Sequence, residues 1–178
     1  MKEIKIEWTT IERAEPNQVY KKFIGLLPKD TESIMANRGN PYAEGRMSLK
    51  FIKQWEANKN KLKKYFKNNK QYEYNSYEEI IRLILRLCLT GYDWNYHIQS
   101  LKDDDNGHGY TLFIASTKNG LIKAITHNSY GTCSGCDTLL KISEYKTGYP
   151  TKEQVNEYMT LALHLVQRMK KIDFNCEI

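Results

Sequence analysis

Long apolar stretches are missing from this 178-residue sequence. A helix needs roughly 20 consecutive apolar residues to cross a bilayer, and no run here approaches that length, so we expect no membrane span. The first six residues, Met1 to Ile6, include three charged side chains and lack the apolar centre of a secretory signal. These absences favour a globular protein of the cytoplasm.

Familiar catalytic motifs are also absent. The sequence has no P-loop, no Gly-x-Gly-x-x-Gly and no Gly-x-Ser-x-Gly, and no pair of carboxylates stands out. Cysteine is scarce, with Cys88, Cys133, Cys136 and Cys176. A chain long enough to bury its own core, without a secretory signal, is expected to keep its cysteines as thiols. A binding protein is therefore favoured over an enzyme.

Positive charge is present in excess but is unevenly spread. The formal net charge is +6, from 27 basic and 21 acidic residues. One segment carries eight lysines against the single acid Glu56, while the rest of the chain is almost neutral. The eight are Lys50, Lys53, Lys59, Lys61, Lys63, Lys64, Lys67 and Lys70. Such a cluster is either a solvated helix face or a docking surface for a polyanion or an acidic protein.

The hydrophobic pattern predicts an α+β fold, in which a three-stranded antiparallel meander packs against helices. Residues 1–47 form an N-terminal region, with a strand at 2–8, a helix at 17–27 and a loop at 37–45. Residues 48–178 form the α+β domain. Its first two predicted elements are a basic amphipathic helix at 48–67, capped by Ser48, and a helix at 77–90, opened by Ser76 and ended by Gly91. A meander at 96–127 follows, with a turn at Lys118–Gly120. The last two are a short helix at 138–145 and a helix at 152–171, opened by Thr151.

A cysteine-containing loop, Gly131 to Asp137, follows the meander and allows three interpretations. The cysteines act as small buried apolar side chains, as half of a zinc site, or as a redox dithiol. Zinc needs two further ligands, for which His127, His164, Cys88 and Cys176 are candidates. Cys133, Cys136 and His127 are the candidate metal residues, because His127 ends the preceding strand. A Cys–His hydrolase is a further option that nothing in the spacing selects.

Two segments carry a resemblance to a known group of proteins. The block Ser129-Tyr130-Gly131-Thr132-Cys133-Ser134-Gly135-Cys136-Asp137-Thr138-Leu139, followed by the stretch at 158–167, resembles a largely uncharacterised family of small proteins of phages and mobile elements in Gram-positive bacteria. Trp55-Glu56-x-Asn58-Lys59-x-x-Leu62 resembles it too. The resemblance implies a phage accessory protein in the host cytoplasm and carries over no catalytic residue. Some phage proteins of this size inhibit host defence, including CRISPR nucleases.

Together these features predict a phage-encoded binding protein that inhibits a host defence system or nucleic-acid enzyme, such as a CRISPR nuclease, by direct contact. One alternative is a nucleic-acid-binding module that uses the basic helix. Another is a Cys-x-x-Cys zinc or redox protein. No catalytic residue is predicted, the eight lysines are the predicted contact residues, and zinc is the one cofactor considered.

Overall fold

A computed structural model describes residues 49–173, which all belong to one compact unit, Met47–Ile178. The predicted strand at 2–8, the helix at 17–27 and the cap at Ser48 lie outside the described residues. The described elements are α3 (Leu49–Asn68), η2 (Gln71–Tyr74), α4 (Tyr77–Leu87), β1 (Trp94–Asp105), β2 (His108–Thr117), β3 (Ile122–Tyr130), α5 (Thr138–Ser143), α6 (Lys152–Gln167) and β4 (Lys170–Asp173).

The sheet is antiparallel, with the strands in the order β1-β2-β3-β4. A two-residue turn at Asn106-Gly107, where φ is 53° and 84°, joins β1 to β2. The predicted Asn-Gly turn joins β2 to β3, with Gly120 at a φ of 73°. Both turns use residues that tolerate positive φ. The α+β class and the three-stranded meander are thus confirmed.

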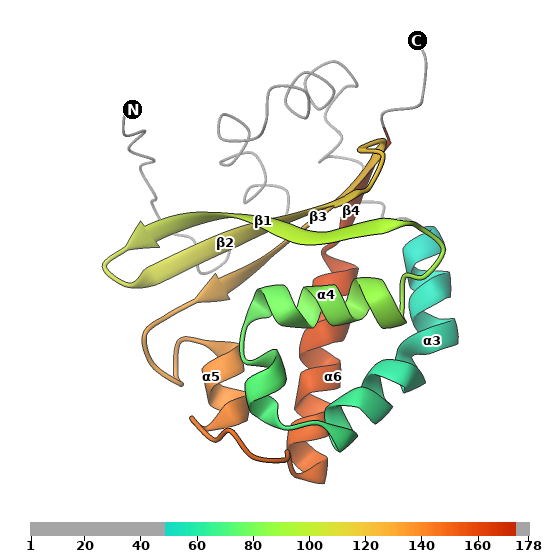
Figure 1. The fold of residues 1–178 in the computed structure, drawn as a ribbon. Helices are drawn as coiled ribbons and strands as arrows, with labels where there is room; N and C mark the ends of the chain where they lie inside the picture. Colours follow the sequence, from blue (N-terminus) through green and yellow to red (C-terminus); the bar gives the residue numbers. More distant parts are fainter. Residues whose placement is uncertain (1–48, 174–178) are drawn as a thin grey trace. The chain divides into compact units, whose positions relative to one another are not determined.

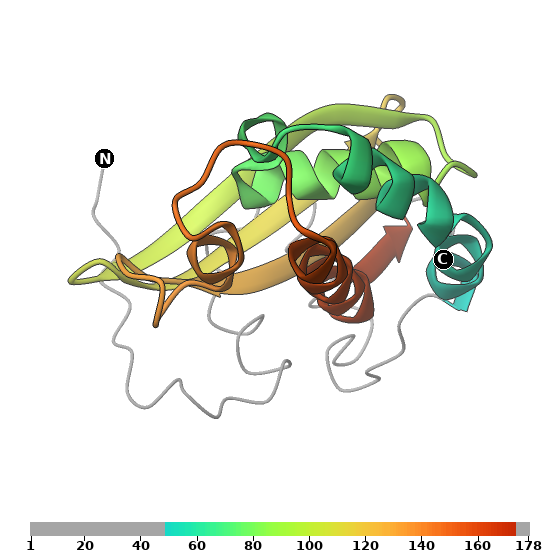
Figure 2. The same cartoon turned by 90° about the horizontal axis from the view of Figure 1, so that it is seen from below.

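The α-helices of residues 49–173, which are α3 to α6, lie on one face of the sheet (Figure 1). α4 packs on β1, and α6 packs on β3. α3 packs mainly on α6 and α4, and its Phe51 also contacts Trp94 of β1. Seen from the helix side in Figure 2, α3 lies at the edge of the helical layer. The hydrophobic core fills the space between the layers and joins Trp55, Leu62, Phe66, Ile84, Phe113 and Leu165 with their neighbours.

The helix starts follow the sequence signals. Ser76 Oγ accepts a hydrogen bond from the backbone N–H of Glu79, 3.2 Å away, at the start of α4. Thr151 and Gln154 form the complete capping box of α6, in which each side chain binds the other residue's backbone N–H. These contacts satisfy N–H groups that the helix cannot pair by itself.

The predicted end of the helix at 77–90 is wrong. α4 ends at Leu87, and Gly91 does not adopt the left-handed conformation of a C-cap. The backbone N–H groups of Cys88 and Leu89 both bind the carbonyl of Ile84, at 2.8 and 3.0 Å. The indole of Trp94 then donates to the Leu89 carbonyl over 2.8 Å. Because the buried Trp94 side chain binds the Leu89 carbonyl, the chain turns before it reaches Gly91.

The predicted helix at 152–171 is also too long. α6 ends at Gln167, and the chain then forms a strand that the hydrophobic pattern did not indicate, β4. β4 pairs antiparallel with β3, with Ile122 opposite Asp173 and Ile125 opposite Lys170. Pairing with a strand some fifty residues earlier in the chain outweighs the helical pattern.

In the described part of the chain no helix is both long enough and apolar enough to cross a membrane.

Candidate functional site

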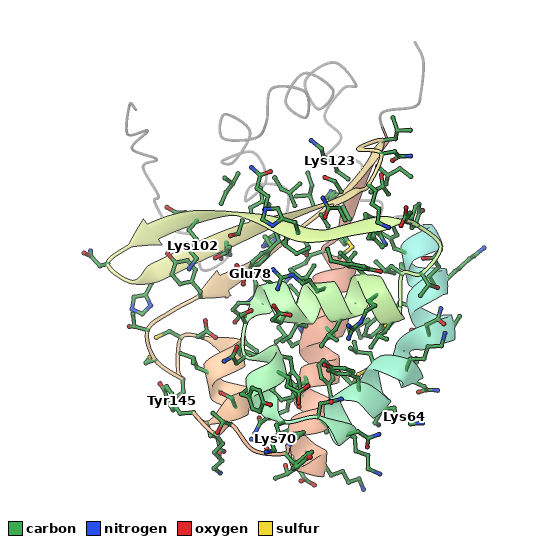
Figure 3. The ribbon with its side chains drawn as sticks, viewed as in Figure 1. Lys64, Lys70, Glu78, Lys102, Lys123 and Tyr145 are labelled. Carbon is green, nitrogen blue, oxygen red and sulfur yellow. The ribbon has the colours of Figure 1, made fainter. Side chains whose placement is uncertain are left out.

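The lysines of α3 lie opposite its apolar side. Phe51, Trp55, Leu62 and Phe66 are buried in the hydrophobic core, and each residue is at most 2% exposed. This stripe fixes the rotation of the helix and sends the intervening lysines outward. The exposed lysines, which we call the lysine face, are Lys53, Lys61, Lys63, Lys64, Lys67 and Lys70. Figure 3 shows Lys64 on α3 and Lys70 just beyond the end of the helix.

Two of the eight predicted lysines stand apart from the lysine face. Lys59 is half-buried and pairs with Glu56 one turn earlier, which offsets its charge. Lys50 lies in the first turn of α3, and its side chain is outside the described part of the structure. The lysine face therefore keeps most of the local positive charge in contact with solvent.

An exposed aromatic surface continues the lysine face beyond α3. The Lys70 ammonium lies 5.9 Å from the centre of the Tyr149 ring. Two backbone hydrogen bonds, from Gln71 to the Gly148 carbonyl (2.8 Å) and from Tyr72 to the Thr147 carbonyl (3.4 Å), join η2 to this loop. Tyr72 is 54% exposed and Tyr149 is 64% exposed. No local pattern predicts this surface, because its two halves lie far apart in the chain.

An aromatic cluster beneath this surface holds the end of α3 in place. The ring of Tyr74 lies 4.9 Å from Phe66 and 5.1 Å from Tyr158, centre to centre. The Tyr74 hydroxyl donates to the Phe66 carbonyl at 3.1 Å, and the Tyr158 hydroxyl donates to Gln71 Oε1 at 2.8 Å. The buried hydroxyls have hydrogen-bond partners and the rings meet in tilted and edge-to-face contacts, which makes a rigid support for the exposed residues above them.

The Cys-x-x-Cys loop joins β3 to α5. Cys133 and Cys136 are both exposed, and their sulfur atoms lie 2.7 Å apart. The backbone N–H groups of Cys136 and Asp137 both bind the Cys133 carbonyl, at 3.0 and 2.9 Å. The interpretation of these cysteines as small buried side chains is therefore wrong. Their exposure follows from this tight turn, which projects both thiols away from the core.

The two thiols differ in acidity. The hydrogen bond from Cys136, followed by one from the backbone of Gly135, lowers the pKa of Cys133. The same contact with Cys133 raises the pKa of Cys136. Cys88, in the core, provides a contrast, because burial raises its pKa to about 12. Among these three cysteines, Cys133 is the one in which the thiolate, the nucleophilic form, is favoured.

His127 lies in different surroundings from the two exposed cysteines. It is buried on β3, where burial and then the charges of Arg168 and Lys170 lower its pKa to about 3. Among the described residues, no group of three or more His, Cys, Asp or Glu side chains is arranged to hold a metal ion. Of the other candidates, Cys88 is in the core, His164 is exposed on α6, and Cys176 lies outside the described residues.

A different histidine, His108, lies next to the cysteine loop. A Cβ placed on Gly131 would stand 2.3 Å from Cys136 Cβ and 2.8 Å from His108 Nδ1, so both groups crowd the same glycine. The hairpin explains this proximity, because Gly109 on β2 pairs with Tyr130 on β3. His108 is not among the candidate residues predicted from the sequence.

A small pocket opens beside the loop, between the sheet and the starts of α4 and α5. Its volume is about 240 Å³, and Lys102, Thr111, Phe113, Tyr130, Tyr77, Glu78, Asp137 and Leu139 are among the residues that line it. Figure 3 shows Lys102 and Glu78 on this side of the molecule. Asp137 forms part of the wall and caps α5 by accepting hydrogen bonds from Leu139 and Leu140.

Comparisons of the chain with protein-family models, with curated proteins and with solved structures gave no match.

Proposed function

We propose that this chain is a binding protein that acts by direct contact, with the lysine face of α3 as the docking surface for an acidic partner. The observation that supports this is that the two sides of α3 differ, because one is buried in the core and the other carries exposed lysines. Its buried side carries the packing, so the exposed ammonium groups contribute little to the fold. Several like charges on one side of a fixed helix attract a polyanionic surface and accelerate encounter with it.

The partner we favour is a host defence or nucleic-acid enzyme, such as a CRISPR nuclease. The resemblance of the cysteine block to phage proteins supports this choice. A cationic helix bound to an acidic face of such an enzyme would inhibit it by blocking access or movement. Because the lysine face contains no arginine, its contacts are diffuse charge attraction rather than bidentate pairing.

Capture from a bacterial lysate tests this function. The Lys63→Glu/Lys64→Glu variant reverses two charges of the lysine face, and Lys118→Glu/Lys141→Glu reverses two exposed lysines elsewhere. We expect the wild type and the control to retain a nucleic-acid or defence enzyme and to inhibit its purified form, and the lysine-face variant to lose both properties. Equal capture and inhibition by all three proteins would contradict the proposal.

A second candidate function, binding of single-stranded nucleic acid, is favoured by the exposed tyrosines beside Lys70. Bases stack on exposed aromatic rings while lysines follow the backbone phosphates, and each stacked base contributes about 1–3 kcal/mol. Tyr72 and Tyr149 provide such rings at the end of the lysine face.

A labelled single-stranded oligonucleotide tests this candidate by fluorescence anisotropy across a series of salt concentrations. We expect affinity to fall steeply with salt, and each reversed lysine to lower the logarithmic slope by about 1. Tyr72→Ala/Tyr149→Ala should weaken binding, whereas Tyr96→Ala, an exposed tyrosine on β1, should not. An affinity that does not change with salt would rule the candidate out.

A further inference from the structure

The cysteine loop has the geometry of a reactive pair of thiols. Cys133 and Cys136 present their sulfur atoms to solvent with 2.7 Å between them. Neither belongs to the hydrophobic core, whereas Cys88 is completely buried. Two thiols in contact at the surface need little movement to form a bond between them, and nothing in the core opposes that movement.

The loop is anchored at the end that carries Cys136. Asp137, the next residue, accepts hydrogen bonds from the backbone of Leu139 (2.8 Å) and Leu140 (3.1 Å) and from the hydroxyl of Tyr77 (2.9 Å). The Cys133 carbonyl is bound in turn by the N–H groups of Cys136 and Asp137. The two cysteines are therefore held at a fixed separation by contacts that do not involve their sulfur atoms.

We propose that Cys133 and Cys136 form a dithiol site that reduces accessible disulfide bonds by thiol–disulfide exchange. Cys133 is the attacking thiol and Cys136 the resolving one. The lowered pKa of Cys133 and the raised pKa of Cys136 agree with this order. The proposal does not depend on the lysine face or on the partner that it binds.

The exchange takes place in two steps. The Cys133 thiolate attacks one sulfur of the substrate disulfide, whose S–S bond breaks, and the departing sulfur takes a proton from water. Cys136 then loses its proton to water and attacks Cys133 Sγ. The mixed S–S bond breaks, the second substrate sulfur leaves as a thiolate and takes a proton from water, and a Cys133–Cys136 disulfide remains. The substrate gains two electrons and two protons, and the protein loses the same number. An added dithiol, dithiothreitol, restores the reduced pair and is itself oxidised.

The test uses the full chain with Cys176→Ser, so that the loop cysteines and the buried Cys88 are the thiols present. The reduced protein is mixed with glutathione disulfide, quenched with acid, alkylated and mapped by mass spectrometry. We expect a Cys133–Cys136 disulfide with release of two glutathione molecules, while Cys88 stays reduced. Cys136→Ser should accumulate a mixed disulfide at Cys133, and Cys133→Ser should react roughly tenfold more slowly.

A second arm replaces glutathione disulfide with insulin and follows the reduction of its chains by dithiothreitol. Rapid formation of the Cys133–Cys136 disulfide in the first arm, together with faster insulin reduction in the second, supports a site that accepts protein disulfides. Reaction with glutathione disulfide alone supports a site for small disulfides. Equal rates for the wild type and Cys133→Ser in both arms would overturn the proposal. So would persistent glutathione adducts on both cysteines in place of the internal disulfide. Thermal melts of each variant confirm that folding is unchanged, as expected for exposed side chains.

Discussion

Tyr77 donates its phenolic O–H to Asp137 Oδ1 over 2.9 Å, which joins the first turn of α4 to the residue that caps α5. The same hydroxyl accepts a hydrogen bond from the backbone N–H of Leu139, at 3.2 Å. Both side chains are buried. The Tyr77 hydroxyl therefore connects α4 to α5 through two residues that are sixty positions apart in the sequence. It also supports the cysteine loop, which ends at Asp137.

Replacing Tyr77 with phenylalanine tests the importance of this connection. Tyr77→Phe keeps the ring in the core but removes the hydroxyl, so the buried Asp137 carboxylate loses a partner. We expect the free energy of unfolding, measured in urea, to fall by about 1–3 kcal/mol. Tyr145→Phe, at a side chain that is 65% exposed, is the control and should change it by less than about 0.5 kcal/mol. Equal stability of the two variants would show that the connection is dispensable.

Glycine is required at one position of the cysteine loop and not at the other. In Gly131→Ala the new methyl group would lie 2.3 Å from Cys136 Cβ, so the loop must shift, whereas in Gly135→Ala the nearest atom, Cys133 Sγ, would be 3.7 Å away. We expect Gly131→Ala to lower stability by about 1–3 kcal/mol and to change the rate at which the thiols react. Gly135→Ala should preserve both. Thermal melts and thiol titration measure these effects, and a larger effect at Gly135 would be inconsistent with this loop geometry.

His127 should make stability depend on pH. Burial and the charges of Arg168 and Lys170 lower its pKa to about 3, against about 6.5 in an unfolded chain. Below pH 6.5 the unfolded state binds the proton and the folded state does not. The contribution of His127 to the free energy of unfolding is therefore fully present above pH 6.5. It is lost as the pH drops towards 3, by up to about 1.4 kcal/mol per pH unit.

The comparison between variants isolates this contribution. His127→Phe should show a shallower loss of stability between pH 6.5 and 4.5 than the wild type, because the group that takes up the proton on unfolding is gone. His164→Gln changes a histidine whose side chain is exposed on α6 and should keep the wild-type slope. Urea denaturation at each pH gives the slopes. An unchanged slope in His127→Phe would mean that this residue does not cause the dependence.

The two sides of α3 should respond differently to substitution. Leu62 is fully buried, so Leu62→Ala should lower the free energy of unfolding by about 2–5 kcal/mol. Lys64→Ala, at an exposed position two residues away, should change it by less than about 0.5 kcal/mol. Chemical denaturation of both variants decides the matter. A large loss of stability in Lys64→Ala would mean that the lysine face is part of the packing, which would weaken its assignment as a docking surface.

The features that the sequence predicted well depend on short-range signals. The capping pairs at Ser76 and Thr151 marked the starts of α4 and α6, and Asn119-Gly120 marked a hairpin turn. The features that it missed depend on contacts between distant segments. The end of α4 is set by Trp94, and β4 exists because β3 offers it an edge.

The same division applies to the candidate sites. The 3.6-residue period of the apolar side chains was enough to place the exposed lysines on one side of α3. The aromatic extension at Tyr72 and Tyr149 depends on two hydrogen bonds between loops far apart in the sequence, which no local pattern records. The loop of Cys133 and Cys136 was located from its residues, but its exposure depends on the turn that Asp137 anchors.

Lysine footprinting in the presence of a bacterial lysate tests the docking role of the lysine face most directly. The protein is labelled briefly with an amine-reactive acylating reagent, alone and with lysate at low salt, and the labelled lysines are measured by mass spectrometry. We predict that Lys63, Lys64 and Lys67 become protected in the lysate and regain their reactivity at high salt, while Lys118 and Lys141 react equally in all conditions. Protection confined to Lys118 and Lys141, or no protection of the lysine face, would contradict the account.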